Sequence, residues 1–130
     1  MSSQNREHLK YTPEHEWIEV QDDTAIIGIT QYAQEALGDL VFIELPEVGQ
    51  EFASGDQFAV VESVKAASEV YMPITGEVLD VNSDLEESPE SLNSSPFDDG
   101  WLVKIRISNP AELKETMNCE DYTAYVEGLE

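Results

Sequence analysis

The sequence predicts a single, mainly β domain with helices at its periphery. Short apolar stretches alternate with turn signals through most of its 130 residues, as in folds built from short strands. The gaps between these stretches leave room only for turns, so neighbouring strands should pair antiparallel, without helical crossovers. A hydrophobic content of 41% is ordinary for one globular domain of this length.

The strands are predicted from the alternation of apolar and polar residues. Alternation is clearest at residues 101–107, where Trp101 and every second residue after it share one face, while Lys104 and Arg106 share the other. This pattern is typical of a half-buried strand. Weaker alternation predicts further strands at residues 16–20, 24–29, 40–45, 57–63, 68–74 and 77–82.

Capping signals predict two helix starts. Thr30 can N-cap a short helix over residues 31–37, whose apolar side chains form one stripe, and Gly38 can end that helix. The run NPAE at 109–112 has a capping side chain, a first-turn proline and a third-position glutamate in the order that opens a helix.

The remaining segments are assigned by spacing and composition. Residues 109–130 are expected to form a C-terminal helical part, because apolar side chains recur there at helical spacing: Tyr122, Tyr125, Val126 and Leu129. Residues 84–99 are rich in Ser, Glu, Asp and Pro, and we interpret them as a connection with a short helical turn near 88–92. Residues 1–10 are expected to be a flexible N-terminal segment of one domain spanning 1–130.

The charge balance argues against two classes of partner. Six Lys and Arg against 28 Asp and Glu give a formal net charge of −22 and a pI near 4.1. Nucleic acids and anionic membranes are bound by clusters of basic residues, which this chain lacks. No apolar run approaches the ~20 residues of a membrane helix. We therefore expect neither nucleic acid nor a membrane as a partner.

The single cysteine and the N-terminal residues indicate a compartment. Cys119 cannot form an internal disulfide, which fits a reducing environment. The opening MSSQNREHLKY has neither the apolar stretch of a signal peptide nor the amphipathic pattern of a transit peptide. The sequence as given therefore predicts a cytoplasmic protein.

Residues suited to catalysis are few. His8 and His15 are the only histidines, too few for a histidine metal site or a catalytic triad, and we interpret His15 as structural. Cys119 fits a small, buried helix residue better than a nucleophile. No nucleophile elbow, phosphate-binding glycine loop or redox cysteine pair occurs. These observations predict a protein that is not an enzyme and holds no metal.

One position stands out from this background. Lys65 is one of only four lysines, and it lies between residues 58–63 and 68–72, which can form the two arms of a hairpin. A lysine at that turn would present its amine to solvent from a backbone held on both sides, and small neighbours such as Ser63 and Ala66 leave room for an approaching group. The pattern alone also fits an ordinary turn lysine that aids solubility.

The segment around this lysine resembles a known motif. The octet ESVKAASE at 62–69 is similar to the lipoyl-attachment motif of the glycine cleavage H-protein family. The resemblance extends over nearly the whole chain through YTPEHEWI at 11–18, GITQYAQEALGDLVFIELP at 28–46 and NSSPFDDGW at 93–101. Two departures are small: Met72 stands where a small residue is more usual before Pro73, and the first ten residues carry no family signal.

The resemblance implies a fold and a modification. Proteins of this family have the biotinyl/lipoyl carrier fold, a flattened antiparallel β-barrel or sandwich with the modified lysine at a hairpin tip. The chain would then be one lipoyl-carrier domain, with Gly55 and Gly76 as turn formers on either side of the hairpin. The implied cofactor is lipoic acid, attached through an amide to Lys65 by a lipoate ligase or a lipoyl/octanoyl transferase.

The resemblance also implies partners. The lipoyl group would take an aminomethyl group from a pyridoxal-phosphate-dependent glycine decarboxylase and deliver it to a folate-dependent aminomethyltransferase. A dihydrolipoamide dehydrogenase would then reoxidise it. The chain itself would be a carrier, expected to be a monomer, without an active site of its own.

Two further groups of residues are assigned by the resemblance. Glu16 and Glu69 are expected to border the cleft that holds the loaded arm, although both also fit ordinary surface acids. Glu62 is expected to be a recognition handle for the attachment enzyme and for all the partners. The remaining expected recognition residues are Ser63, Val64 and Ala66.

Three alternatives stay open from the sequence. A biotin carrier shares the fold, but its lysine typically has Met on both sides, whereas Val64 and Ala66 flank Lys65 here. An adaptor with the same fold would carry no acyl group at all. A lipoyl relay that donates lipoate to 2-oxoacid dehydrogenases would have the same sequence features as a glycine cleavage carrier.

Overall fold

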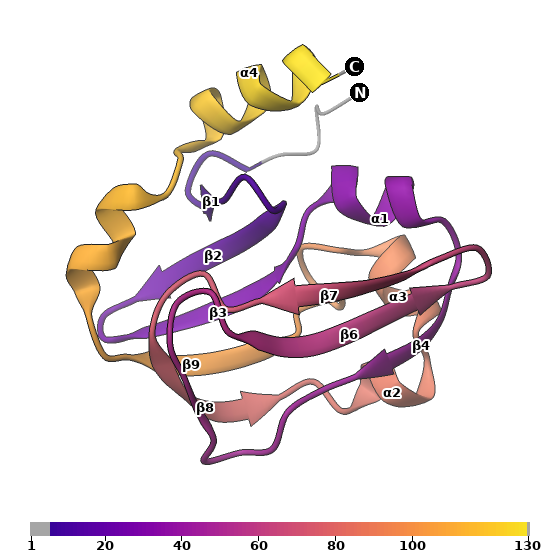
Figure 1. Cartoon of the computed structure of the whole chain (residues 1–130), viewed down its shortest axis with the longest axis horizontal. Helices are drawn as coiled ribbons and strands as arrows, with labels where there is room; N and C mark the ends of the chain where they lie inside the picture. The colour runs from indigo at the N-terminus through magenta and orange to yellow at the C-terminus, as the bar shows by residue number, and fades with distance from the viewer. Residues whose placement is uncertain (1–5, 130) are drawn as a thin grey trace.

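Two antiparallel sheets packed face to face form the body of the protein, in a computed structural model that describes residues 6–129 (Figure 1). The larger sheet has the order β1-β2-β3-β9-β8-β5, with the strands Lys10–Tyr11, Glu16–Gln21, Thr24–Ile29, Val103–Ile107, Gly76–Val81 and Glu51–Phe52. The smaller sheet has the order β4-β6-β7, with the strands Leu40–Glu44, Gln57–Ser63 and Ala67–Tyr71.

This arrangement confirms the predicted fold class and refines it. The fold is mainly β, and every strand pair within residues 6–129 is antiparallel. The two sheets share no strand and do not close into a barrel, so the sandwich form of the prediction holds. No helix of the described part is long and apolar enough to cross a membrane.

Strand boundaries differ from the prediction where side chains or proline interrupt the ladder. Residues 101–102 precede β9, and the side chain of Asn82 donates to the carbonyl of Trp101 at 2.8 Å instead of a strand neighbour. Strand β7 ends at Tyr71, because Met72 donates to the Asp56 carbonyl and Pro73 has no N–H. The two-residue strands β1 and β5 are too short for alternation to reveal.

The predicted helix caps form as expected, with one change of partner. Thr30 Oγ1 accepts from the Ala33 N–H at the start of α1, Gln31–Leu37. Asn109 caps Pro110–Glu115, which is a 3₁₀ helix, η1. Its Glu112 does not close a capping box but accepts from the Thr75 N–H and Oγ1 at 2.6 and 2.9 Å. The second helix of the predicted C-terminal part is α4, Cys119–Leu129.

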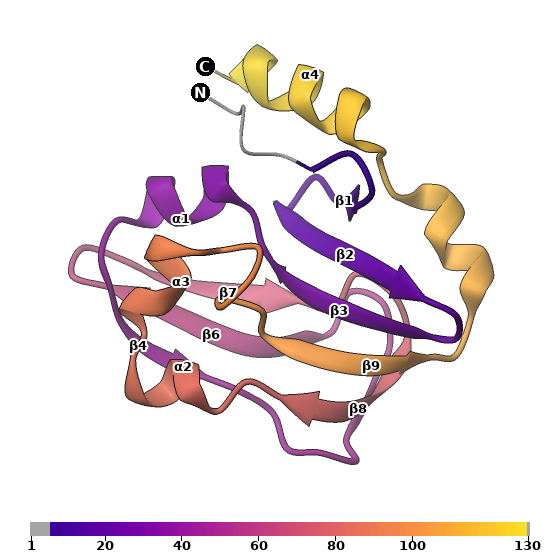
Figure 2. The same cartoon turned by 180° about the vertical axis from the view of Figure 1, so that it is seen from behind.

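The polar segment 84–99 is more structured than the connection predicted from its composition. It contains the short helices α2, Asp84–Glu87, and α3, Glu90–Ser94, which lie beside β4 (Figure 2). Leu85 and Leu92 are fully buried, so two apolar side chains hold an otherwise polar segment against the sandwich.

Residues 6–10 contact the body of the protein. Arg6 forms an ion pair with Asp98 at 2.8 Å, Leu9 is buried, and Lys10 pairs in β1. The flexibility expected of residues 1–10 stays a prediction, and residues 1–5 lie outside the described part. Gly76, predicted as a turn former, lies within β8, where a Cβ would meet the Arg106 carbonyl.

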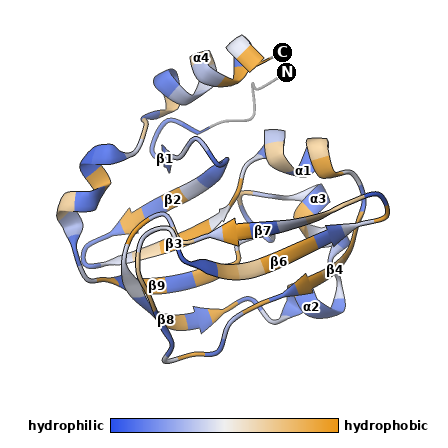
Figure 3. Cartoon of the chain, in the orientation of Figure 1, coloured by the Kyte–Doolittle hydropathy of each residue, from blue (hydrophilic) through white to orange (hydrophobic). Residues whose placement is uncertain are grey.

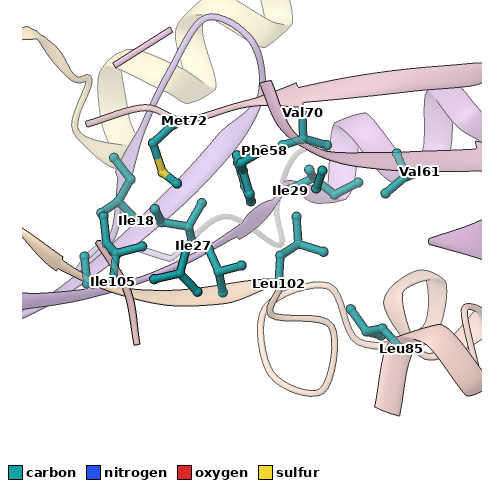
Figure 4. Close-up of a cluster of buried hydrophobic side chains, with 14 of the residues drawn as sticks. Ile18, Ile27, Ile29, Phe58, Val61, Val70, Met72, Leu85, Leu102 and Ile105 are labelled. Atoms are coloured by element: carbon teal, nitrogen blue, oxygen red, sulfur yellow. The ribbon is translucent and has the colours of Figure 1, made fainter. Parts of the chain in front are cut away.

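The main core fills the space between the two sheets. The larger sheet contributes Ile18, Ile27 and Ile105, and the smaller sheet contributes Phe58, Val61 and Val70 (Figure 4). Hydrophobic and hydrophilic bands alternate along β8 and β9, as expected for strands with one buried face (Figure 3). The predicted alternation of residues 103–107 is therefore confirmed.

A second cluster docks α4 onto the far end of the larger sheet. Tyr122 of α4 stacks on Tyr11 with ring centroids 4.6 Å apart and planes 8° apart. The Tyr122 hydroxyl lies 2.8 Å from Nδ1 of His15 and 2.7 Å from Oγ1 of Thr30. His15 is therefore a structural histidine, as predicted, and burial lowers its pKa. One buried hydroxyl thus connects α4, the loop before β2 and the cap of α1.

The Tyr122 hydroxyl should contribute measurably to stability. Tyr122→Phe keeps the stacked ring but removes the partner of His15 Nδ1 and one of the two partners of Thr30 Oγ1, so the unfolding free energy should fall by about 1–3 kcal/mol in urea titrations. Tyr125→Phe, on the more exposed face of the same helix, should change it by less than about 0.5 kcal/mol. Equal losses in the two variants would contradict a special role for this hydroxyl.

Candidate functional site

The hairpin between β6 and β7 carries Lys65 at its tip. Ser63 builds this turn: its N–H donates to the Ala66 carbonyl at 2.7 Å, and its Oγ accepts from the N–H groups of Lys65 and Ala66 at 3.3 and 3.1 Å. The Ser63 side chain is buried beneath the tip. Ser63, predicted as a recognition residue, therefore shapes the turn from inside, as a Ser side chain commonly does.

The tip also forms a hydrogen bond with the segment between α1 and β4. The Val64 N–H donates to the Asp39 carbonyl at 3.3 Å. Lys65 is exposed, but its stem lies along the backbone of Gly38, where a Cβ would be 3.4 Å from the lysine Cε. The amine is thus accessible without projecting straight away from the protein, and Gly38, with φ of 88°, leaves the space for it.

Glu16 lies at the start of β2 and is almost completely buried, with 2% of its surface exposed. Its Oε1 accepts from the Thr12 hydroxyl at 2.9 Å, and its Oε2 accepts from the Tyr71 N–H at 3.2 Å. Burial raises the pKa of Glu16 from 4.5 to about 7, although the two hydrogen bonds act in the opposite direction. The carboxyl therefore changes charge near neutral pH.

The backbone before Glu16 is tightly held. His15 has a φ of 72°, in the left-handed region that is unusual for a residue other than glycine. Its N–H donates to the Thr12 carbonyl, and the Thr12 N–H donates to the Glu16 carbonyl. This strained turn, fixed by the contact of His15 with Tyr122, sets the direction of the Glu16 side chain.

Glu69 lies on β7 and is exposed. Its Oε1 accepts from the Tyr71 hydroxyl at 2.7 Å, which raises the pKa of Tyr71. Glu16 and Glu69 line the same small pocket, of about 30 Å³, together with Glu14. The structure thus brings together the two acids that the sequence assigned to one cleft.

This pocket extends between α1 and β7, which begins just after the lysine. Its other lining residues are Ile29, Ala33, Leu37, Val61, Ser68 and Val70, most of which are apolar. The three acids come from β2, from β7 and from the loop before β2. Glu69 is four residues from Lys65, roughly 13 Å along an extended chain. A flexible arm on the lysine can reach the pocket by folding back along β7.

The sequence did not reveal several pocket residues. Ala33 and Leu37 were assigned to the apolar stripe of a helix, and spacing does not tell a stripe that lines a pocket from one that fills a core. Nothing in the sequence distinguished Glu14 from the other acids. Glu16 also borders a larger pocket of about 230 Å³, lined on its far side by Glu112 and Glu115.

The remaining predicted residues surround Lys65 without touching that pocket. Glu62 is half-buried on the outer face of the smaller sheet, opposite Phe42 on one side and Ala67 on the other. Val64 is 76% exposed, and Ala66 is exposed. Within residues 6–129 no three His, Cys, Asp or Glu side chains form a group that could hold a metal ion.

Comparison with known proteins places this arrangement in a family. The family model described as Glycine cleavage H-protein matches residues 9–128. The chain belongs to this family. A curated glycine cleavage system H protein from Parvibaculum lavamentivorans is 55% identical over 122 residues, covering 94% of this chain and 98% of that relative. One from Halothermothrix orenii is 54% identical over 124 residues, covering 95% and 97%.

A solved structure supports the same assignment at the level of the fold. The crystal structure of a glycine cleavage system H protein from Mycobacterium marinum matches with a TM-score of 0.88 and 32% sequence identity. The match covers 94% of this chain and 98% of that one.

Titration of Glu16 should give this H-protein family member a distinctive pH dependence. Between pH 4.5 and 7 the folded state keeps a proton on Glu16 that the unfolded state has released. The unfolding free energy should therefore fall as the pH rises through this window, by about 3 kcal/mol. Glu16→Gln should remove this part of the slope in urea titrations at each pH.

Glu14→Gln is the matched control, because it removes an exposed carboxylate from the same pocket. It should retain the wild-type slope. If Glu16→Gln also retained it, Glu16 would titrate at its ordinary pKa, and the functional use of its burial would be lost.

Proposed function

We propose that this chain is the lipoyl carrier of the glycine cleavage system, with lipoate attached to Lys65. The observation that carries the proposal is the position of this lysine, which is exposed at the tip of a hairpin held by Ser63 from within and by Asp39 from the side. Membership of the H-protein family supports the same assignment.

The residues at the tip suit acylation of the lysine. The neutral amine of Lys65 attacks the carbonyl carbon of an activated lipoyl donor, an amide bond forms, and the activating group leaves with its bonding electrons while the amine loses a proton to solvent. Small neighbours at Ala66 and Ala67 leave the amine approachable. When attached, the dithiolane supplies the redox and group-carrying chemistry, and the protein supplies its placement.

The partners follow from this role. A glycine decarboxylase that uses pyridoxal phosphate loads an aminomethyl group, a folate-dependent aminomethyltransferase removes it, and a dihydrolipoamide dehydrogenase reoxidises the carrier. A lipoate ligase or a lipoyl/octanoyl transferase attaches the lipoate. The chain acts as a substrate of all of them and has no active site of its own.

Glu16 and Glu69 are proposed to hold the loaded arm. The pocket of about 30 Å³ is too small to enclose the arm, so the aliphatic arm is proposed to lie over it, against Ala33 and Leu37, with the cationic amine of its cargo near the two carboxyls. With a pKa of about 7, Glu16 can lose its proton when the cation arrives and regain it when the cation leaves. A cation in the pocket would thus increase the charged fraction of Glu16, which is already partly ionised near neutral pH.

Glu62, Val64 and Ala66 are proposed as recognition residues, because they surround the lysine on the exposed side of the tip. Ser63 contributes indirectly through the shape of the turn. A partner that must engage Lys65 meets an acid on one strand, an exposed valine beside the lysine and a small residue after it.

Lys65→Arg should abolish both modification and function. Incubated with lipoate ligase, lipoate and ATP, the wild type should gain the mass of one lipoyl group, and the variant should gain none, because an arginine forms no such amide. Glycine-dependent reduction with purified partners should follow the same pattern. Lys114→Arg, an exposed lysine of η1, is the control and should behave as wild type.

Wild type that carries the mass of biotin when isolated from its host would favour the biotin carrier instead, and wild type that gains no mass in this incubation would favour the unmodified adaptor. Lipoylation without glycine-dependent reduction would contradict the glycine cleavage role. It would leave the relay to 2-oxoacid dehydrogenases as the better account.

Loss of either pocket acid should shorten the lifetime of the cargo. After loading with glycine, Glu16→Gln and Glu69→Gln should release ammonia and formaldehyde several-fold faster than the wild type, because the cationic amine loses a partner. Glu44→Gln, on the exposed face of β4, is the control. Release of both products at the wild-type rate would remove that residue from the proposed role.

A further inference from the structure

Two adjacent apolar residues of β4 are exposed, which a regular strand does not produce. Val41 is 55% exposed and Phe42 is 47% exposed. Successive side chains of a strand point to opposite faces, so one of the two should face the core. The register between β4 and β6 shifts between Leu40 and Phe42, and this bulge turns both side chains outward.

The exposed pair lies beside the modified hairpin. Phe42 pairs with Glu62, three residues before Lys65, and Leu40 pairs with Ser63. The Val64 N–H is bonded to the carbonyl of Asp39, which places the tip against the start of β4. Figures 1 and 2 both show the end of the β6–β7 hairpin beside the chain that enters β4. Val41, Phe42 and Val64 therefore make one exposed apolar group, here called the tip patch.

The tip patch has an acidic border. Asp39 and Glu44 lie at the two ends of the exposed stretch of β4, and Glu62 lies across from Phe42. Apolar side chains that stay exposed in such a polar setting are typical of a protein contact site. Charge complementarity then calls for a partner with an apolar depression and a basic rim.

The reactions of the proposed partners indicate which of them would bind the tip patch. Three of the proposed partners act on the dithiolane, at the far end of the arm. The attachment enzyme alone must bring the Lys65 Nζ into its own active site, so it must contact the residues within a few ångströms of that atom. Lys65 and the tip patch share this end of the molecule.

We propose that the tip patch is the docking surface for the enzyme that acylates Lys65, with Phe42 as its central contact. This inference rests on the proposed function, because it presumes that Lys65 is acylated. It adds residues of β4, distant in the sequence from the attachment motif, to what that enzyme recognises.

The test compares acylation of Phe42→Thr with that of Val48→Thr. Threonine suits a strand, and Val48 is 61% exposed in a turn away from the hairpin, which makes it a matched control. With purified lipoate ligase, lipoate and ATP, kcat/KM for the unmodified Phe42→Thr should fall at least tenfold, mainly through KM. Val48→Thr should stay within twofold of wild type.

Further measurements distinguish the loss of enzyme docking from a loss of folding. In NMR titrations of the unmodified, labelled wild type with ligase, the amides of Phe42 and Val64 should shift, and that of Val48 should not. Phe42→Thr that has been fully lipoylated by prolonged incubation should be reduced by dihydrolipoamide dehydrogenase at the wild-type rate. Glu62→Lys should raise KM for acylation and weaken its dependence on salt.

Normal acylation of Phe42→Thr would overturn the proposal. Equal losses in acylation and in reduction would also overturn it, because the patch would then serve carrier docking in general. A change of sedimentation in Phe42→Thr, with normal acylation, would assign the patch to self-association. Failure of the proposed function is distinct from all of these, since the wild type itself would then not be acylated.

Discussion

The hydroxyl group of Tyr122 fixes the relative positions of three segments that are far apart in the sequence. It bonds to His15 in the loop before β2 and to Thr30 at the cap of α1, and its ring is fully buried in α4. Glu16 follows His15 directly, and Ala33 and Leu37 of α1 line the pocket with it. The C-terminal helix thus sets the separation of two pocket walls that it does not itself contact.

The smaller sheet supplies the third wall and the origin of the arm. Strand β7 is an edge strand, and Glu16 accepts the N–H of Tyr71 at its end, so a carboxylate replaces the missing strand neighbour. The same strand leads directly from the Lys65 tip to Glu69. Because the tip is bonded from within by Ser63, an arm on Lys65 starts from a fixed point, and the volume it must search for the pocket is reduced.

Local signals in the sequence predicted local structure well. The Thr30 cap, the alternation of residues 103–107 and the hairpin around Lys65 depend on neighbours within a few residues, and all are present. Long-range partners could not be predicted in this way. The bond from Glu112 to Thr75 and the burial of Leu92 depend on which segments meet in space.

The same distinction between local signals and long-range partners applies to the residues of the candidate site. Lys65 was predicted because a motif and a turn coincide, and its exposure needs no distant partner. The difference between Glu16 and Glu69, one buried and one exposed, is invisible in a chain with 28 acids. The bulge that exposes Val41 also could not be predicted from the sequence, because a shift of one residue in the pairing of β4 with β6 leaves the residue pattern of β4 unchanged.

Burial makes the charge of the Glu16 carboxyl depend on which groups lie beside it. A carboxylate can accept from both the Thr12 hydroxyl and the Tyr71 N–H, whereas a glutamine has one acceptor oxygen and would turn its NH2 toward one of these donors. With a pKa of about 7, Glu16 is only partly charged near neutral pH when the pocket is empty, and an entering cation would shift it toward the ionised form. Under the proposed function, the charge of this acid would therefore respond to the arrival and departure of a cationic cargo.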